Sequence, residues 1–502
     1  MTEELRKNLE NVKTTLADVE RFQHAVRLTN FDLETICPSK AMEEQGELAA
    51  FLSAKAYELT KKDDFIESAK YVFSHRDELP ELDKVWAESW MRDYKREKNI
   101  SVEQQHEFSR IYNKAYVDWL NAKQKNDFAI FAPSLEAVRA AELKTISLFE
   151  EKKSPVYDNL LDMYERGMTS ADLDAAFGEC VRRLVPLLQK IKSSKKKIRT
   201  DFLSRPVSDE QQRKMAQYLL ETIGFDFSRG AFTTTEHPFT EGLAKNDARV
   251  TTHYYPEQFA SSMFSITHEG GHALFEQLQP HEDHEHFITG GKTMGMHESV
   301  SRFYENRIGR SRDFIHLIYP KAREIFSDVL SDVSENELYE ALNVVSPSLI
   351  RTEADEFTYT FHVIIRYEME KLIVEGGEAI KGLPEIWNKK YSDYLGVLPS
   401  GFSDGILQDV HWSSGFGYFP AYAVGNMYNA MYFKKMQADF DVSSAVRSGD
   451  FGKINGWMKD HVFAKADRLS PKEWLSEITG GAFSPNDFLD YLEEKYSALY
   501  EL

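Results

Sequence analysis

The sequence of 502 residues contains only two cysteines, Cys37 and Cys180. Secreted proteins of this length usually carry several disulfides, so the low count favours a reducing compartment, the cytoplasm. The opening MTEELRKNLENVKTTL has no apolar core of a signal peptide, and no apolar run reaches about 18 residues anywhere in the chain. We therefore expect neither a secretory leader nor a transmembrane helix.

Positive charge is also scarce, since 61 Lys and Arg residues face 81 Asp and Glu residues for a formal net charge of −20. Such a surface repels nucleic acid and anionic lipid, which excludes both as general partners. A deep site lined by some of these carboxylates would favour cationic or peptide-like ligands over phosphates. The alternative is that the acidic residues form a solvated surface that aids solubility.

Apolar residues are plentiful, at 42% of the sequence, so the chain can bury a large core. Residues 16–36 and 215–227 place them at intervals of three and four, which predicts helices with one buried face. One helix is expected to start after FAPS, with Ser134 as its N-cap. Strand-like alternation is confined to residues 229–259. The pattern predicts a mostly α protein with one small β element.

The stretch SITHEGGHALFEQ, residues 265–277, directly follows this β element. His268 and His272 lie one helical turn apart, so both imidazoles project from the same face and can bind one Zn²⁺. Glu269 is placed to reach a metal-bound water and to accept its proton as the water attacks a carbonyl. This is the H-E-x-x-H arrangement of zinc hydrolases.

The alternative is a chance match on an ordinary surface helix. Apolar residues on both sides of the motif instead predict a buried helix, in which two histidines and a glutamate need a partner that offsets their lost hydration. A metal ion is such a partner. The flanking apolar residues are Met263, Phe264, Ile266, Leu274, Phe275 and Leu278.

A third ligand is expected on a neighbouring helix, MGMHESVSRFYE, residues 294–305. We predict Glu298, because two histidines and one glutamate leave a fourth position open for water, as in catalytic zinc sites. His297 is a competing candidate. A further group, His281, His284 and His286, lies in a polar stretch that we interpret as a solvated loop.

Gly270 and Gly271 fill the gap between the two histidines, although glycine in a helix interior costs about 0.5–1 kcal/mol relative to alanine. We predict that their missing side chains let a neighbouring helix or an active-site loop approach the backbone closely.

Six short motifs resemble the M32 metallocarboxypeptidases, the thermostable carboxypeptidase 1 type, in sequence and in order. They are HPF (237–239), DARVT (247–251), HEGGH (268–272), HES (297–299), IRTEAD (350–355) and GILQDVHW (405–412). The resemblance implies a neurolysin-like, mostly helical fold whose two lobes flank a deep groove, with residues 1–502 forming one catalytic domain. It also implies a zinc-type metal, removal of single residues from peptide C-termini, and a homodimer. Val300 departs from the pattern, in which HES precedes glutamine or a similar polar residue.

A carboxypeptidase must bind the terminal carboxylate of its substrate, and arginine suits this task through its planar, charged fork. Arg351 and Arg249 are the two candidates with motif context. The alternative for each is a structural salt bridge, with Asp355 and Asp247 respectively. His237 is interpreted either as closing one end of the groove or as hydrogen bonding within a loop.

The tetrahedral oxyanion of peptide hydrolysis requires hydrogen-bond donors. Similarity to related enzymes that carry a histidine and, about ten residues later, a tyrosine assigns His411 and Tyr422 to substrate and transition-state binding. Tyr418 is either a third such group or an aromatic that packs beneath the loop. Gln408 and Asp409 are expected to orient this loop or a ligand histidine.

These residues predict a metal-dependent carboxypeptidase that acts on peptides with a free C-terminus. One alternative is an oligoendopeptidase that uses the same metal site, and another is a helical scaffold with a structural metal and a fourth protein ligand. Zinc is the expected ion, and cobalt or manganese can substitute in such a site.

Overall fold

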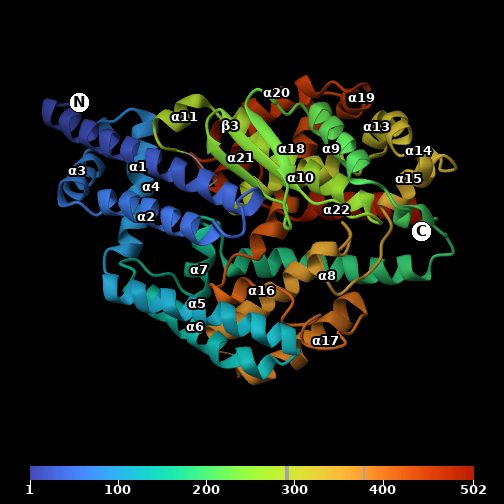
Figure 1. The fold of residues 1–502 in the computed structure, drawn as a ribbon, viewed down its shortest axis with the longest axis horizontal. Helices are drawn as coiled ribbons and strands as arrows, with labels where there is room; N and C mark the ends of the chain where they lie inside the picture. The colour runs from blue at the N-terminus through green and yellow to red at the C-terminus, as the bar shows by residue number, and fades with distance from the viewer. Residues whose placement is uncertain (289–292, 377–378) are drawn as a thin grey trace.

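The computed structural model describes residues 1–288, 293–376 and 379–502, and its chain is mostly α-helical, as predicted (Figure 1). The first nine helices precede the only sheet among the described residues. They are α1 (Glu3–Thr35), α2 (Met42–Thr60), α3 (Asp63–Ser74), α4 (Glu81–Glu97), α5 (Val102–Lys125), α6 (Phe128–Leu148), α7 (Tyr157–Tyr164), α8 (Ser170–Ser193) and α9 (Asp209–Ile223).

The remaining helices follow the sheet. They are α10 (Phe259–Leu278), α11 (His281–Glu285), α12 (Met294–Arg302), α13 (Arg312–Ile325), α14 (Ser327–Leu330), α15 (Glu335–Leu342), α16 (Tyr359–Glu375), α17 (Leu383–Leu395), α18 (Pro420–Asp439), α19 (Val442–Ser448), α20 (Phe451–His461), α21 (Pro471–Thr479) and α22 (Asn486–Tyr500). A π-helix, Phe303–Ile308, continues α12. No helix among the described residues is long and apolar enough to cross a membrane.

The small β element is a three-stranded sheet in the order β1-β3-β2, formed by β1 (Gly230–Thr234), β2 (Thr240–Ala244) and β3 (Asp247–Thr252). β2 and β3 are antiparallel and form a hairpin, whereas β1 pairs with β3 in parallel. Both β2 and β3 contact α10, and β2 also contacts α1. The sheet therefore lies beside the helix that carries the HEGGH motif, as the sequence predicted.

Two hydrophobic clusters hold the described chain together. The larger one extends from Ala115 on α5 to Tyr500 on α22 and includes both sides of α10. The smaller one joins α1, α3 and α4 around Leu5, Phe65 and Trp86. The helices that position the site are α10, α12 and α18, and all three belong to the larger cluster. α12 contacts both α10 and α18.

α10 is buried along most of its length, which explains why it carries few charged residues. Its apolar side chains include Met263, Ile266, Leu274 and Phe275, and each is less than 5% exposed. The helix ends at Leu278, directly before Gln279 and Pro280, because the residue before a proline is disfavoured in helical geometry.

The predicted start of a helix at Ser134 is wrong. α6 begins at Phe128 with Asp127 as its N-cap, and it runs through Pro133. A proline in a helix interior costs about 3 kcal/mol, but α6 buries apolar residues on both sides of it, including Phe131 and Leu135. Each fully buried side chain of this size contributes about 1.5–3 kcal/mol, so packing outweighs the local signal.

Candidate metal centre

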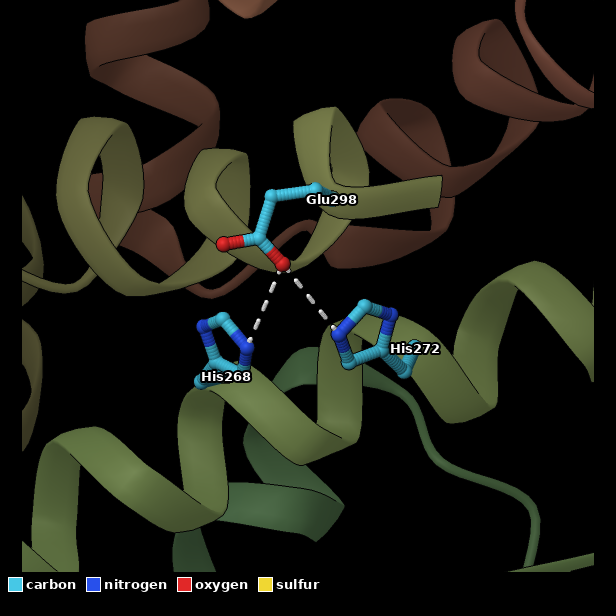
Figure 2. Close-up of side chains that lie close together, drawn as sticks. All are labelled: His268, His272 and Glu298. Atoms are coloured by element: carbon cyan, nitrogen blue, oxygen red, sulfur yellow. Dashed lines mark ion pairs between the residues drawn. The ribbon is translucent and has the colours of Figure 1, made fainter. Parts of the chain in front are cut away.

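His268, His272 and Glu298 form the one group of metal-ligating side chains found among the described residues (Figure 2). Their ligand atoms all lie within 4.8 Å of one another. Glu298 Oε2 is 3.6 Å from His268 Nε2 and 3.5 Å from His272 Nε2. The histidines point from one face of α10 toward Glu298 on α12, so atoms of three side chains converge on one point.

The other ring nitrogen of each histidine already has a partner. His268 Nδ1 is 2.9 Å from Glu305 Oε2, in the π-helix. His272 Nδ1 contacts His297 Nδ1, and His297 Nε2 is 3.0 Å from Glu276 Oε1. These contacts turn both Nε2 atoms toward Glu298, the arrangement that orients histidine ligands in metal sites. His297, the competing ligand candidate, uses both of its nitrogens in this chain of contacts.

The charges around the three side chains suit a cation. Burial alone would raise the pKa of Glu298, but Arg302 and the two histidines hold this pKa well below its usual range. Burial lowers the pKa of His272 to about 3, so its ring is neutral and can donate a lone pair to a metal. Burial would lower the pKa of His268 as well, but the Glu298 and Glu305 carboxylates raise it. The donor set, two histidine nitrogens and one carboxylate, fits a divalent metal ion.

Glu269 lines the same cavity as the three side chains but belongs to no metal-ligating group. The Thr240 hydroxyl on β2 donates to Glu269 Oε2 at 2.7 Å and fixes the carboxylate. Burial raises the pKa of Glu269, while His268 and the Thr240 hydrogen bond offset part of this effect. The sheet thus positions the carboxylate that the sequence marked as a general base.

A groove crosses the metal-ligating residues. It consists of one cavity of about 570 Å³, which all three residues line, and a second of about 540 Å³, which His268 and Glu298 line. Both cavities share the lining residues Pro238, His268, Glu269, Glu298 and Tyr422. We call the first the glutamate half, because Glu20, Glu241 and Glu276 line it, and the second the arginine half, because Arg302, Arg310 and Arg351 line it.

Arg351 is held rigidly at the wall of the arginine half. Its Nε and Nη2 atoms donate to Asp409 Oδ1 at 3.1 and 3.0 Å, and Nη1 donates to the Tyr359 hydroxyl at 3.2 Å. Its guanidinium also lies 4.8 Å from the ring centre of Tyr422. Its acidic partner is therefore Asp409, whereas the sequence suggested Asp355. Gln408 and Asp409 orient this arginine and its loop; neither contacts a ligand histidine in the part of the chain that is described.

His411 and Tyr422 come together, with His411 Nε2 3.4 Å from the Tyr422 hydroxyl, but His411 lines neither half of the groove. Burial lowers the pKa of His411 to about 4, so its ring is neutral at pH 7. Tyr422 lines both halves of the groove. Tyr418 lines the glutamate half and packs edge-on against Tyr422 and Tyr164, which combines the two roles considered for it.

Arg249 and His237 line neither half of the groove. Arg249 pairs with Asp247 at 2.9 Å, the salt bridge considered as its alternative role, and lies over the Phe31 ring. His237 is exposed in the connection between β1 and β2, and its carbonyl accepts a hydrogen bond from the Thr235 hydroxyl. Its neighbour Pro238 lines both cavities.

His281 and His284 lie in a short helix, α11, and His286 is its C-cap, which corrects the interpretation of this stretch as a loop. Asp283 anchors it from inside, because its buried carboxylate pairs with Arg468. His281, His284 and His286 belong to no metal-ligating group in the described chain. Part of the connection that follows, residues 289–292, lies outside the described residues.

The two glycines of the motif meet different neighbours. A Cβ atom at Gly271 would lie 2.7 Å from Ser301 Cα and 3.0 Å from the Val300 carbonyl oxygen, both backbone atoms of α12. A Cβ atom at Gly270 would meet only the side-chain tips of Ile223 and Leu220. Close approach of a second helix, predicted for both positions, therefore applies to Gly271. Val300 is fully buried at this contact and lines neither cavity.

Sequence reasoning missed four residues that support the site. Arg302 and Glu305 follow Glu298 by four and seven residues. Residues at this spacing lie on one face of a helix, so the sequence could have predicted that both lie near Glu298. Thr240 gave no signal, because its partner Glu269 is remote in sequence. Glu370 on α16 gave none either, although it accepts hydrogen bonds from Trp412 Nε1, the Gly417 amide and the Tyr157 hydroxyl at 3.0, 2.8 and 2.7 Å.

Glu370 therefore fixes both ends of the 411–418 segment, and we expect Glu370→Gln to disturb it. Glutamine has one side-chain acceptor oxygen where three donors converge, so an N–H group must face a donor. Such a mismatch in a buried site costs about 1–3 kcal/mol. Thermal unfolding should show this loss together with a several-fold lower kcat. Glu375→Gln, at the exposed end of α16, is the control, and equal behaviour of both variants would contradict the role given to Glu370.

Two histidines one turn apart, a glutamate from a second helix and a neighbouring carboxylate, all within a long groove, define the HEXXH class of metallopeptidases. Comparisons with known proteins agree. The family model for Carboxypeptidase Taq (M32) metallopeptidases matches residues 11–496. The chain belongs to this M32 family and is a metal-dependent carboxypeptidase that acts on peptides.

The similarity extends over whole chains. Carboxypeptidase 1 of Bacillus subtilis is 36% identical over 97% of this chain and 97% of its own length. Thermostable carboxypeptidase 1 of Thermus thermophilus is 36% identical over 94% of this chain and 95% of its own. The crystal structure of an M32 carboxypeptidase from Deinococcus radiodurans matches with a TM-score of 0.95 at 31% identity over 100% of both chains.

Proposed function

We propose that this enzyme removes single amino acids from the C-terminus of peptides, with zinc held by His268, His272 and Glu298. The observation that carries this proposal is the groove itself: His268 and Glu298 line both the arginine half and the glutamate half, and His272 lines the glutamate half. A substrate carboxylate bound by Arg351 would place the preceding peptide bond toward Glu269. Cobalt or manganese would fit the same donor set.

A divalent metal bound here would polarise the scissile carbonyl and make a water molecule more acidic. Glu269, fixed by Thr240, accepts the proton of the attacking water and then returns it to the leaving amine. Tyr422, with His411 behind it, donates a hydrogen bond to the oxyanion that develops. Arg351 binds the terminal carboxylate, because Asp409 and Tyr359 hold its guanidinium in one orientation.

Arg249 and His237 are proposed to support the outer wall of the groove rather than to contact the reacting atoms. Arg249 is the register partner of Glu241 on β2, and His237 directly precedes Pro238. Tyr418 is proposed to contact substrate in the glutamate half.

A comparison of two peptides tests the proposal. We expect the metal-loaded enzyme to release the last residue of an acetylated peptide acid at least about a hundredfold faster than that of the same peptide amide. An Arg–carboxylate contact contributes a few kcal/mol, and each 1.4 kcal/mol is tenfold. A chelator should abolish both reactions, and added Zn²⁺ should restore them. Mass spectrometry of the products provides the measurement.

Equal cleavage of acid and amide, or internal fragments among the products, would favour the oligoendopeptidase alternative. A chelated protein that keeps its full activity would contradict the metal-dependent mechanism. A structural metal requires a fourth protein ligand, and the described residues supply a group of three. This observation disfavours the scaffold hypothesis.

We further propose that residues 1–502 form one catalytic domain in two lobes, because the larger hydrophobic cluster extends from α5 to α22 and α1, from the smaller cluster, contacts β2. A homodimer and a cytoplasmic location are proposed from the family resemblance and from the two unpaired cysteines, Cys37 and Cys180. Sedimentation analysis of the purified protein would test the dimer.

A further inference from the structure

The two halves of the groove differ in charge. Arg27 is the one arginine among the described residues that line the glutamate half, and it faces Glu20, Glu241 and Glu276. The arginine half contains Arg302, Arg310 and Arg351 together with Glu305, Glu353 and Asp355, besides Glu269 and Glu298, which line both halves. Glu305 pairs with Arg302 and Arg310. The Asp355 carboxylate is already occupied, because it accepts hydrogen bonds from the Ser346, Phe357 and Thr358 amides.

This charge difference matters for substrate orientation, given the proposed function on which the inference rests. If the terminal carboxylate lies in the arginine half, the residues upstream of the cleaved bond must lie in the glutamate half, since the two cavities meet at the metal-ligating residues. The glutamate half is therefore where the enzyme meets the rest of the peptide.

The three glutamates that line only this half are not equivalent. Glu20 pairs with Arg27. Glu276 contacts His297 at 3.0 Å and packs against Gly242, where a Cβ atom would lie 2.4 Å from Glu276 Oε2. The Glu241 side chain forms no hydrogen bond or ion pair with any residue that the structure describes, and the residue is half-buried. It is the carboxylate of this half that lacks a partner within the described chain.

The strand geometry explains why Glu241 stays unpaired. Its register partner on β3 is a cation, Arg249. Arg249 instead binds Asp247 with two hydrogen bonds, at 3.0 and 2.9 Å, and lies over Phe31 on α1. Burial raises the pKa of Glu241, Arg27 offsets part of this effect, and the neighbouring Glu276 adds to it. A cation that enters the cavity would compensate both the burial and the repulsion.

We propose that Glu241 is a specificity-determining residue that receives a cationic group of the substrate upstream of the cleaved bond, with Glu20 and Glu276 adding to the negative potential. The group is an ammonium or guanidinium. It has two sources in a peptide: a lysine or arginine side chain, or the free α-amino group of a short peptide.

The test uses acetylated pentapeptide acids that differ at one of the three positions upstream of the cleaved bond. At each position lysine is compared with norleucine, which has a similar shape but no charge, and with glutamate. We expect kcat/KM for lysine to exceed that for norleucine by about tenfold at one position or more, the size of a charge-assisted contact in a partly dry site. The glutamate peptide should be slower than the norleucine peptide at that position.

Variants assign the effect to one residue. Glu241→Gln should bring the lysine-to-norleucine ratio to about one, and Glu241→Lys should reverse the order in favour of the glutamate peptide. The matched control is Glu285→Gln, since Glu285 is exposed on α11 and lines neither cavity. Each result is a ratio within one enzyme, so a smaller folded fraction cannot imitate it.

Unacetylated tripeptides and tetrapeptides distinguish the two sources of charge. A tenfold advantage over their acetylated forms that disappears in Glu241→Gln would identify the α-amino group as the ligand. The proposal is overturned if wild type shows no preference for positive charge in any of these peptides, or if Glu241→Gln keeps the preference. Failure of the proposed function would appear differently, as cleavage of the norleucine peptide amide at the same rate as the acid.

Discussion

Replacing Glu269 with glutamine should lower kcat at least about a thousandfold while the metal content stays normal. The carboxylate lies beside the metal-ligating residues without belonging to them, so its loss removes the group that accepts the proton of the attacking water. General-base catalysis contributes about 10²–10⁴-fold. The glutamine amide oxygen can still accept the 2.7 Å hydrogen bond from the Thr240 hydroxyl, so the local structure should persist.

Three measurements check this prediction: steady-state hydrolysis of an acetylated peptide acid, metal content by elemental analysis, and thermal unfolding. Glu257→Gln is the control, because Glu257 is exposed just before α10 and should behave as wild type. Turnover that survives in Glu269→Gln at normal metal content would show that another group accepts the proton. A variant that loses its metal would instead place Glu269 among the ligands.

Adding a side chain at Gly271 should weaken metal binding, whereas the same change at Gly270 should not. In Gly271→Ala the new Cβ atom meets the backbone of α12 at 2.7 Å, so α12 must shift, and it carries Glu298. Overpacking of this kind costs about 1–3 kcal/mol, and Gly271→Leu should cost more. We expect the Kd for Zn²⁺ to rise at least about tenfold, with a comparable loss of kcat/KM.

Gly270→Ala is the matched control on the same helix. Its Cβ atom meets the Ile223 Cδ1 and Leu220 Cδ2 atoms, which are tips of flexible side chains that can rotate away. Alanine also favours a helix by about 0.5–1 kcal/mol over glycine, which offsets part of the crowding. Competition with a chromophoric chelator measures the Zn²⁺ affinity of each variant. Equal affinities for the two alanine variants would contradict the close-approach explanation.

Local periodicity was enough to predict the centre of the site. Residues four apart on a helix share one face whatever surrounds them, so the spacing of His268 and His272 placed two imidazoles together. The helix around Glu298 and the β element before α10 could also be predicted, because both follow from local sequence patterns. The helix start at Ser134 failed because burial along α6 outweighs the local preference of Pro133.

Contacts between remote segments were decided only by the tertiary structure. Residues 351 and 409 meet because the chain returns to the same groove wall, so the sequence neighbour Asp355 was the wrong partner for Arg351. Thr240 hydrogen bonds to Glu269, and Gly271 packs against α12. Neither contact can be predicted from the spacing of residues in the sequence. The chain by itself determined a helix that presents two histidines and a glutamate. Long-range packing, which balances burial against charge pairing, decided which arginines and carboxylates surround them, and it left Glu241 facing the groove.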